Sequence, residues 1–542
     1  MIPLRAARFL CALAGVGLLL TCAVALGGQK GEIAAGEAMY RRGVLPSGRP
    51  LQAEREGGVR ISGANAACVN CHRRSGLGMR EGQRTIPPIA GSYLFHPRAG
   101  AVDDLDLPFV EGMQADRDPY TDATLGRAIR SGIAGDGRKL SYLMPHYALT
   151  DDEMTAVVAY LKSLSPGVVP GVTRSTIHFA TIVTPDADPV KRQGVLDVLR
   201  TFFDDKNHYT RAESPRLQSS HRMMFKVNRH WELHVWELTG APETWEEQLQ
   251  TKLAAEPVFA VISGIGGNTW APVHRFCERA ALPCLFPNVD LPVVSENDFD
   301  SLYFSKGVLL EAQLLAHALG EQPQIRRVVQ VYRANDVGVA AAAELARALE
   351  PVRIERVDHV LPDGSADLTR ALSDIRSSDA VVLWLRPNDV AALPVPPPEA
   401  AAVFMSGRMG GLEHAPLPGT WRSVARMAYP FDLPEHRRVR VDYPLGWFRI
   451  RQVPVVAEEE QTDTYLACSV LSETMNHMVD TFVRDYLVER LEGMLEHRII
   501  TGYYPRLTLA PSERFASKGG YLVHFAGAAG TRVVADTEWI AP

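Results

Sequence analysis

The chain has 542 residues, 46% of them hydrophobic, so it is long enough for several domains and apolar enough to bury their cores. Lys and Arg number 57 against 63 Asp and Glu, which gives a formal net charge of -6 at pH 7. Nucleic-acid binding normally requires a basic excess that this composition lacks. We therefore expect no nucleic-acid partner.

The first segment of the chain is typical of a secretory signal peptide. Arg5 and Arg8 precede an apolar run over Phe9–Leu26 that ends in small residues. We predict a signal peptide over residues 1–28, export to the periplasm, and no stable membrane span after cleavage. An uncleaved membrane anchor is the alternative, because the run is close to the length that spans a bilayer. A lipid anchor on Cys22 has less support, because a threonine precedes that cysteine.

Beyond the signal peptide and the motif described next, three cysteines remain. Cys277 and Cys284 stand seven residues apart, and export makes a disulfide between them chemically possible. Two buried free thiols are the alternative, because the sequence does not give the Cα separation that a bridge requires. Cys468 lies in a helical stretch and is interpreted as an inert core thiol.

Residues 68–72 read Cys-Val-Asn-Cys-His, the spacing of a haem-attachment site. In such a site the thiols of Cys68 and Cys71 add to the haem vinyl groups, and His72 is placed to ligate the iron. A redox or zinc Cys-x-x-Cys is the alternative, but the first needs a βαβ setting and the second another ligand pair, and neither is near. We predict one covalently attached haem c.

Around this motif, residues 33–164 resemble the small helical cytochromes c. The resemblance implies an all-α haem domain, which we place at residues 29–166. The segment Ile33–Tyr40 is similar to the opening Gly-x-x-x-Tyr helix of that class, in which a small residue lets the first and last helices cross closely.

A capping box predicts the last helix of this domain, over residues 149–164. Thr150 is its N-cap, Glu153 stands at the third helical position, and apolar residues follow.

The resemblance also implies residues that hold the haem. Pro87 stands in a Pro-Pro-Ile-Ala-Gly segment similar to one whose proline carbonyl accepts a hydrogen bond from the haem histidine; an ordinary Pro-Pro turn is the alternative. Met144, in Leu-Met-Pro, is the expected sixth ligand, because the class places Met-Pro just before the last helix. A thioether ligand suits electron transfer rather than oxygen chemistry. The competing ligands are Met79, Met113 and His146.

Residues 167–175 are rich in Pro and Gly and are predicted to form a linker. After it, β-rich runs alternate with helical stretches, which predicts doubly wound parallel sheets. Residues 176–542 are long enough for two such α/β lobes. The clearest β-rich runs are Thr176–Val183, Trp231–Leu238, Val258–Ser263, Arg327–Tyr332 and Ala380–Leu385.

The order and spacing of these runs make this region similar to the periplasmic solute-binding proteins of the branched-chain amino-acid type. The segments that carry the resemblance are residues 261–270, 283–287, 327–338 and 379–384. It implies two lobes around a cleft for a small organic ligand, at the carboxyl ends of the strands.

The candidate ligand contacts follow predicted strands in both lobes. Gly266, Gly267, Asn268 and Thr269 form a strand-to-helix turn whose N–H groups would face the carboxylate of a ligand. A tight connection with no ligand is the alternative. The candidates after second-lobe strands are Tyr332, Asp336 and Arg408. No acidic residue is clearly placed to hold an amino group, so amino-acid specificity does not follow.

We therefore expect an electron carrier and not an enzyme. Its binding-protein-like region would dock a redox partner, such as a periplasmic dehydrogenase or oxidase, or bind a small ligand. The alternative is a receptor of an ABC-type importer with an accessory haem domain, which leaves the haem unexplained. A haem peroxidase needs an open iron site and is disfavoured if Met144 binds the iron.

Overall fold

The computed structural model describes two compact units. Met1–Val169 with His477–Tyr486 make up the first unit, and Pro170–Asn476 with Leu487–Pro542 make up the second. The division at residue 169 falls inside the predicted linker. The described residues are 29–495 and 501–542, apart from 82–83, 96–117, 165–168, 214–228, 297, 353, 363, 365–367, 479–480, 512 and 527–531.

The predicted signal peptide, residues 1–28, lies outside the described residues. In the described part of the chain, every helix is either too short or too polar to cross a membrane.

Helices and short strands together build the first unit. The chain is helical over residues 29–42. The other helical segments are η1 (Gly63–Ala66), α2 (Val69–His72), α3 (Gly91–Leu94), α4 (Asp122–Ser131) and α5 (Asp151–Ser163). The strands are β1 (Gln52–Arg55), β2 (Val59–Ser62), β3 (Met79–Glu81), β4 (Arg84–Ile86) and β5 (His146–Tyr147).

The prediction of an all-α domain is not confirmed, because these strands pair. β1 pairs antiparallel with both β2 and β5, and β3 pairs antiparallel with β4. Gly57 and Gly58 explain the first hairpin. They adopt φ values of 92° and 80° between β1 and β2, a conformation that glycine adopts without steric cost.

Helix α5 begins as the sequence predicts. The backbone N–H of Thr150 donates to Glu153 Oε2 at 2.9 Å, and the N–H of Glu153 donates to Thr150 Oγ1 at 3.3 Å. The opening helix crosses α5 at Gly36. A Cβ atom at Gly36 would lie 2.1 Å from the carbonyl oxygen of Ala156 and 2.7 Å from Cβ of Tyr160. Only a residue without a side chain fits there.

We expect Gly36→Ala to destabilise the first unit by about 1–3 kcal/mol, because the added methyl group must push two helices apart. Gly31→Ala is the matched control. Gly31 lies in the same helix with nothing within 4 Å of its added Cβ, so alanine there should leave stability unchanged or raise it slightly. Thermal unfolding of the two haem-loaded variants, followed by haem absorbance, measures the difference. Equal melting temperatures would contradict the close crossing.

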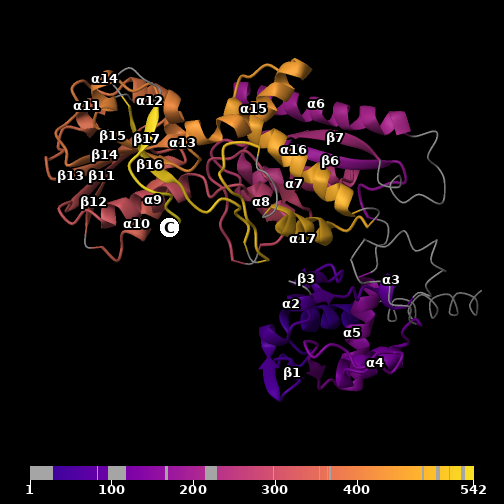
Figure 1. The fold of residues 1–542 in the computed structure, drawn as a ribbon. Coiled ribbons are helices and arrows are strands. Elements are labelled where there is room, and N and C mark those ends of the chain that lie inside the picture. The colour runs from indigo at the N-terminus through magenta and orange to yellow at the C-terminus, as the bar shows by residue number, and fades with distance from the viewer. Residues whose placement is uncertain are drawn as a thin grey trace, which may run out of the picture. The chain divides into compact units, whose positions relative to one another are not determined.

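The first lobe of the second unit is a parallel five-stranded sheet in the order β10-β9-β8-β6-β7. The order reverses between β6 and β8. Figure 1 shows its helices flanking β6 and β7. The strands are β6 (Thr176–Val183), β7 (His230–Glu237), β8 (Ala260–Ile262), β9 (Cys284–Leu285) and β10 (Ser301–Leu302). The helices of this lobe are α6 (Pro189–Glu213), η4 (Pro242–Thr244), α7 (Trp245–Ala255) and α8 (Ala271–Arg279).

The second lobe repeats this arrangement in a seven-stranded sheet of order β12-β11-β13-β14-β15-β16-β17. Its first five strands are parallel and the last two antiparallel. The strands are β11 (Arg327–Arg333), β12 (Glu355–Leu361), β13 (Asp379–Trp384), β14 (Ala402–Ser406), β15 (Ala425–Tyr429), β16 (Tyr521–Phe525) and β17 (Val533–Ala535). The helices are α9 (Val308–Gly320), α10 (Gly338–Ala348), α11 (Leu368–Ala371), α12 (Pro387–Ala391), α13 (Gly407–Gly410), η5 (Leu412–His414) and α14 (Gly419–Arg422). Predicted α/β lobes with parallel sheets are therefore present.

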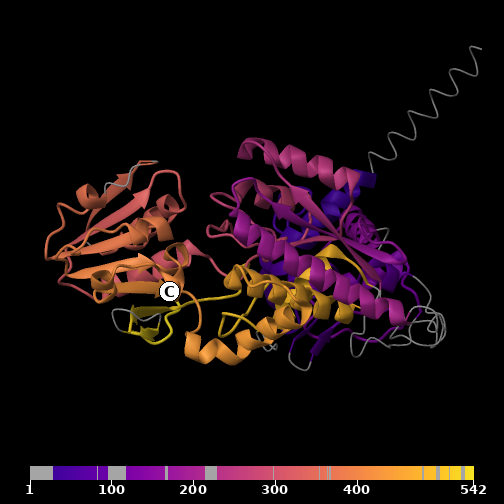
Figure 2. The same cartoon turned by 90° about the horizontal axis from the view of Figure 1, so that it is seen from above.

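Three further helices lie between β15 and β16 of the second lobe in sequence but beside the first lobe in space, as Figures 1 and 2 show. They are α15 (Pro434–Arg451), α16 (Glu458–Met478) and α17 (Arg484–Leu495). Val198 of α6, Phe448 of α15 and Tyr465 of α16 share one buried cluster. Thr464 Oγ1 lies 2.8 Å from Ser263 Oγ, just after β8. Helices from residues 434–495 therefore complete the core of the first lobe.

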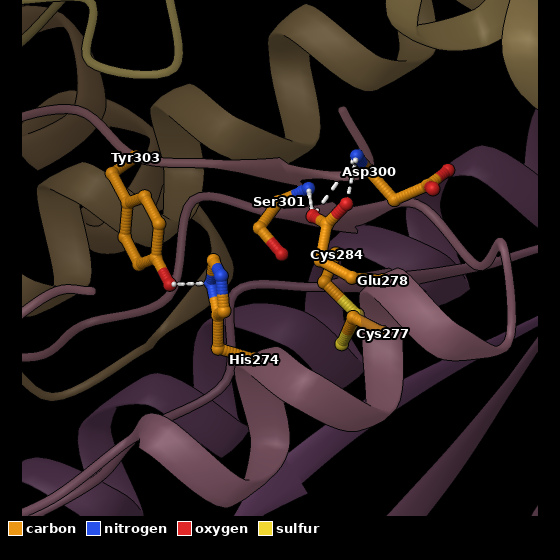
Figure 3. Close-up of a disulfide and its surroundings, with 7 residues drawn as sticks. All are labelled: His274, Cys277, Glu278, Cys284, Asp300, Ser301 and Tyr303. Atoms are coloured by element: carbon orange, nitrogen blue, oxygen red, sulfur yellow. Dashed lines mark hydrogen bonds between the residues drawn. A yellow bond between two sulfur atoms is a disulfide. The ribbon is translucent and has the colours of Figure 1, made fainter. Parts of the chain in front are cut away.

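A disulfide joins Cys277, in the last turn of α8, to Cys284 of β9, with their Cα atoms 6.1 Å apart (Figure 3). Beside it the carboxylate of Glu278 accepts backbone N–H groups of Phe299, Asp300 and Ser301 at 2.8–3.2 Å. Helix α8 is therefore tied to the strands that follow it by one covalent bond and one carboxylate.

Candidate functional site

The Cys-x-x-Cys-His motif forms the short helix α2, with Cys68 as its N-cap and His72 as its last residue. His72 is 7% exposed, and its Nδ1 lies 3.0 Å from the carbonyl oxygen of Pro87. A carbonyl only accepts, so Nδ1 carries the proton and donates it. Nε2 is then left with its lone pair, as an iron ligand requires.

Burial keeps both His72 and Cys68 in their neutral forms. Burial lowers the pKa of His72 to about 4, although the bond to Pro87 opposes the shift, so the imidazole is neutral. Burial also raises the pKa of the Cys68 thiol to about 12. These residues fit haem c, because the Pro87 carbonyl orients a neutral imidazole and the two thiols belong to the same short helical segment.

Met144 lies in the bend before β5, where its N–H donates to the carbonyl oxygen of Ser141 at 2.9 Å. It is half-buried and packs against the same hydrophobic core as Cys68. His146 is exposed, and a Cβ at Gly132 would lie 2.4 Å from its Nε2, so its ring faces that glycine. Met79 is in β3, opposite Ile86. Met113 lies outside the described residues.

The predicted ligand turn of the first lobe lies between β8 and α8, next to the point where the strand order reverses. Such a point is where ligands bind in open α/β sheets. Here the chain's own Asp186, which follows β6, takes that place. Its Oδ2 accepts the N–H of Asn268 at 2.7 Å, and Thr184 Oγ1 accepts the N–H of Gly267 at 3.2 Å. Thr269 Oγ1 accepts the N–H of Ala271 at 3.3 Å.

The second lobe fills its reversal point in the same way. Arg386, two residues after β13, donates Nε and Nη2 to the two carboxylate oxygens of Asp336, which follows β11, both at 2.8 Å. Asp336 is therefore committed to an internal ion pair. Tyr332, also predicted as a ligand contact, instead packs in the core of this lobe with Asp358 of β12 as its hydrogen-bond partner.

Ion pairs join the two lobes at the same edge. Arg386 Nη1 donates to Asp290 Oδ2 at 2.7 Å, and Asp290 belongs to the segment after β9. Arg408, 10% exposed, contacts Asp290 at 3.5 Å and Glu459 of α16 at 2.8 Å. Burial alone would raise the pKa of Asp290, but Arg386, Lys191 and Arg408 hold it well below its ordinary value. Asp290 is thus ionised and shared by two arginines.

Residues 58–165 match the family model described as Cytochrome c. The chain contains a cytochrome c domain. No curated protein matches the sequence. Among solved structures, the chain is similar to a fatty acid ABC transporter substrate-binding protein from Thermomonospora curvata, with 13% identity, a TM-score of 0.49, and 69% of this chain and 94% of that chain covered.

Two further solved structures are similar over the same share of the chain. A substrate-binding periplasmic protein from Ralstonia solanacearum has 14% identity and a TM-score of 0.47, with 66% of this chain and 100% of that one covered. A branched chain amino acid ABC transporter from Thermus thermophilus, with bound valine, has 11% identity and a TM-score of 0.47, with 68% and 98% covered.

The sequence analysis named Asp336 and Arg408 but missed the residues that they and the turn after β8 contact. They are Asp186, Asp290, Arg386 and Glu459. Asp186 and Arg386 carried a usable signal, because each is a charged residue within three positions of the end of a predicted strand. Asp290 and Glu459 follow no such strand end, so their roles depend on tertiary contacts.

Glu311 of α9 is the buried acid behind Arg408. Its Oε1 accepts the N–H of Arg408 at 2.9 Å, and its Oε2 accepts the hydroxyl of Ser406. Burial raises the pKa of Glu311 to about 7, although these bonds oppose the shift. Burial likewise raises the pKa of Glu459 to about 7, against the opposing charge of Arg408.

We expect Glu311 to make the second unit less stable as the pH rises. Between its unfolded pKa of 4.5 and its folded pKa of about 7, the folded state holds a proton that the unfolded state has lost. This contribution reaches at most about 3 kcal/mol. It is fully present below the unfolded pKa and is lost as the pH rises through the folded value.

Glu311→Gln should remove this part of the pH dependence, because glutamine keeps the shape and does not titrate. Urea unfolding from about pH 5 to about pH 8, followed by tryptophan fluorescence, measures it. Glu399→Gln changes an exposed acid and should keep the wild-type slope. Parallel slopes for Glu311→Gln and wild type would contradict the assignment.

Proposed function

We propose that this chain is an exported, non-enzymatic electron-transfer protein. In this proposal it carries one haem c on Cys68 and Cys71, with His72 and Met144 as the axial ligands. Its second unit docks a redox partner, such as a periplasmic dehydrogenase or oxidase, or binds a small organic ligand. The observation that carries the proposal is the hydrogen bond from His72 Nδ1 to Pro87 beside the two cysteines.

The residues around the motif support a site for transferring electrons rather than for binding oxygen. When bound, a haem supplies one-electron redox chemistry. The Pro87 carbonyl fixes the ring of His72, and the apolar core against which Cys68 and Met144 pack keeps water away. A thioether is a soft neutral ligand that favours reduced iron, so Met144 would raise the reduction potential and leave no open iron position.

The cleft of the second unit supports a role other than delivering amino acids. The turn that would receive the carboxylate of an amino acid already binds the carboxylate of Asp186. Asp336, at the facing reversal point, already binds Arg386. A free amino acid would have to displace both internal pairs, and a protein partner or a neutral ligand would not.

We expect Met144→Ala to change the visible spectrum of the reduced protein and to lower its reduction potential, because the iron loses its thioether ligand. Met79→Ala is the matched control, since it removes the competing methionine and should leave both unchanged. Redox titration and spectra of the two haem-loaded variants measure the effect. The haem should also stay on the polypeptide in a denaturing gel.

A changed spectrum in Met79→Ala with an unchanged one in Met144→Ala would transfer the ligand role to Met79. Haem that leaves the wild-type chain in the denaturing gel would refute covalent attachment.

We expect the natively purified chain to carry no stoichiometric amino acid and to be reduced by a periplasmic dehydrogenase. Mass spectrometry of the denatured protein identifies any small molecule, and stopped-flow absorbance follows reduction of the haem. A tightly bound amino acid without electron exchange would reject the proposal in favour of an importer receptor.

A further inference from the structure

Two neighbouring strands of the first lobe bring two histidines and a glutamate together. His178 on β6 lies opposite Glu232 on β7 in the parallel register. Glu232 and His234 are two residues apart on β7, so their side chains share one face of the sheet. His178 and Glu232 are the third residues of their strands, and His234 is the fifth residue of β7.

The ligand atoms are spaced like the corners of a tetrahedron. His178 Nδ1 lies 3.0 Å from His234 Nε2 and 3.5 Å from Glu232 Oε2. His234 Nε2 lies 4.0 Å from Glu232 Oε1. Zinc bonds of about 2.0–2.1 Å in a tetrahedron place the ligand atoms about 3.3 Å apart. One ligand atom from each of the three residues lies within 4.8 Å of the other two, so one ion fits among them after small side-chain shifts.

A second carboxylate orients the histidine that would bind. His234 Nδ1 lies 3.3 Å from Glu256 Oε2, and the same oxygen accepts the indole N–H of Trp236 at 2.9 Å. A carboxylate that accepts from Nδ1 holds the proton there and leaves the lone pair of Nε2 toward His178. This is the carboxylate–histidine arrangement that supports metal ligands in proteins.

We propose that His178, Glu232 and His234 bind a divalent transition-metal ion, with Zn²⁺ as the ion that best matches the spacing. Two imidazoles and one carboxylate suit zinc, whereas Mg²⁺ and Ca²⁺ favour all-oxygen ligands. On binding, the Nδ1 proton of His178 moves to its Nε2, so the ring stays neutral. The site is accessible: the side chains of His178, His234 and Glu232 are 24%, 15% and 50% exposed. Three protein ligands leave the fourth position open to water or to another molecule.

The other histidine–carboxylate group among the described residues does not offer the same site. It consists of His274, Glu278 and Asp298. Glu278 already accepts three backbone N–H groups. His274 Nδ1 lies 2.8 Å from the hydroxyl of Tyr303 (Figure 3), and its Nε2 lies 2.8 Å from Asp298. These bonds would be lost on binding an ion, so this group is structural.

Calorimetric titration of the full, haem-loaded chain with ZnCl₂ tests the proposal. We expect one saturable site, with no heat from Mg²⁺. His178→Gln and His234→Gln should each weaken zinc binding at least about tenfold, and Glu256→Gln should weaken it by about ten- to a hundredfold, since it supports the ligand without touching the ion. His317→Gln is the control. It changes an exposed histidine beside Glu321 and should bind like wild type.

Equal zinc affinity in wild type and in both histidine variants would overturn the proposal, and so would the absence of saturable binding to wild type. Circular dichroism of each variant checks that it is folded. If His178→Gln does not fold, Glu232→Gln, which changes an exposed side chain, decides the question by the same measurement.

Discussion

A buried charge must be paired, and this requirement shapes the cleft of the second unit. Removing an ionised group from water costs several kcal/mol, about as much as a domain can spare, unless an opposite charge replaces the water. Asp290 meets the requirement across the two lobes, because it comes from the first lobe and its partners Arg386 and Arg408 come from the second. Separating the lobes would therefore leave charges that need water or a ligand in their place. Only a ligand or solvent that replaces these ion pairs could therefore separate the lobes.

The filled reversal points limit what the cleft can accept. In the first lobe, Asp186 after β6 accepts an N–H group of the turn after the neighbouring strand β8. In the second lobe, Asp336 after β11 pairs with Arg386 after the neighbouring strand β13. A ligand with a single carboxylate would compete with an aspartate that is already tethered and therefore has no translational entropy to lose. A partner that contacts the rims of the lobes faces no such competition. This comparison is the reason for proposing that the unit docks a partner or takes an uncharged ligand.

Sequence reasoning succeeded where the signal is local. Strand β6 has the predicted bounds Thr176–Val183, and the capping box of Thr150 and Glu153 begins α5 where expected. The β1–β2 hairpin was missed although Gly57 and Gly58 signal a turn, because the resemblance to helical cytochromes outweighed it. The Arg386–Asp290 pair joins residues 96 apart in sequence, and no local pattern encodes that distance. Likewise, the meeting of His178 with His234 depends on the pairing of β6 with β7.

The two units solve opposite electrostatic problems. At the motif the described groups are neutral: an imidazole whose pKa burial lowers and the carbonyl that accepts its hydrogen bond. His72 would hold the iron of a haem as a neutral ligand, so a one-electron change at that iron would not require His72 to gain or lose a proton. Around Asp290, by contrast, the groups are charged: Arg386, Lys191 and Arg408 hold this carboxylate ionised, whereas burial raises the pKa of Glu459, which pairs with Arg408, to about 7.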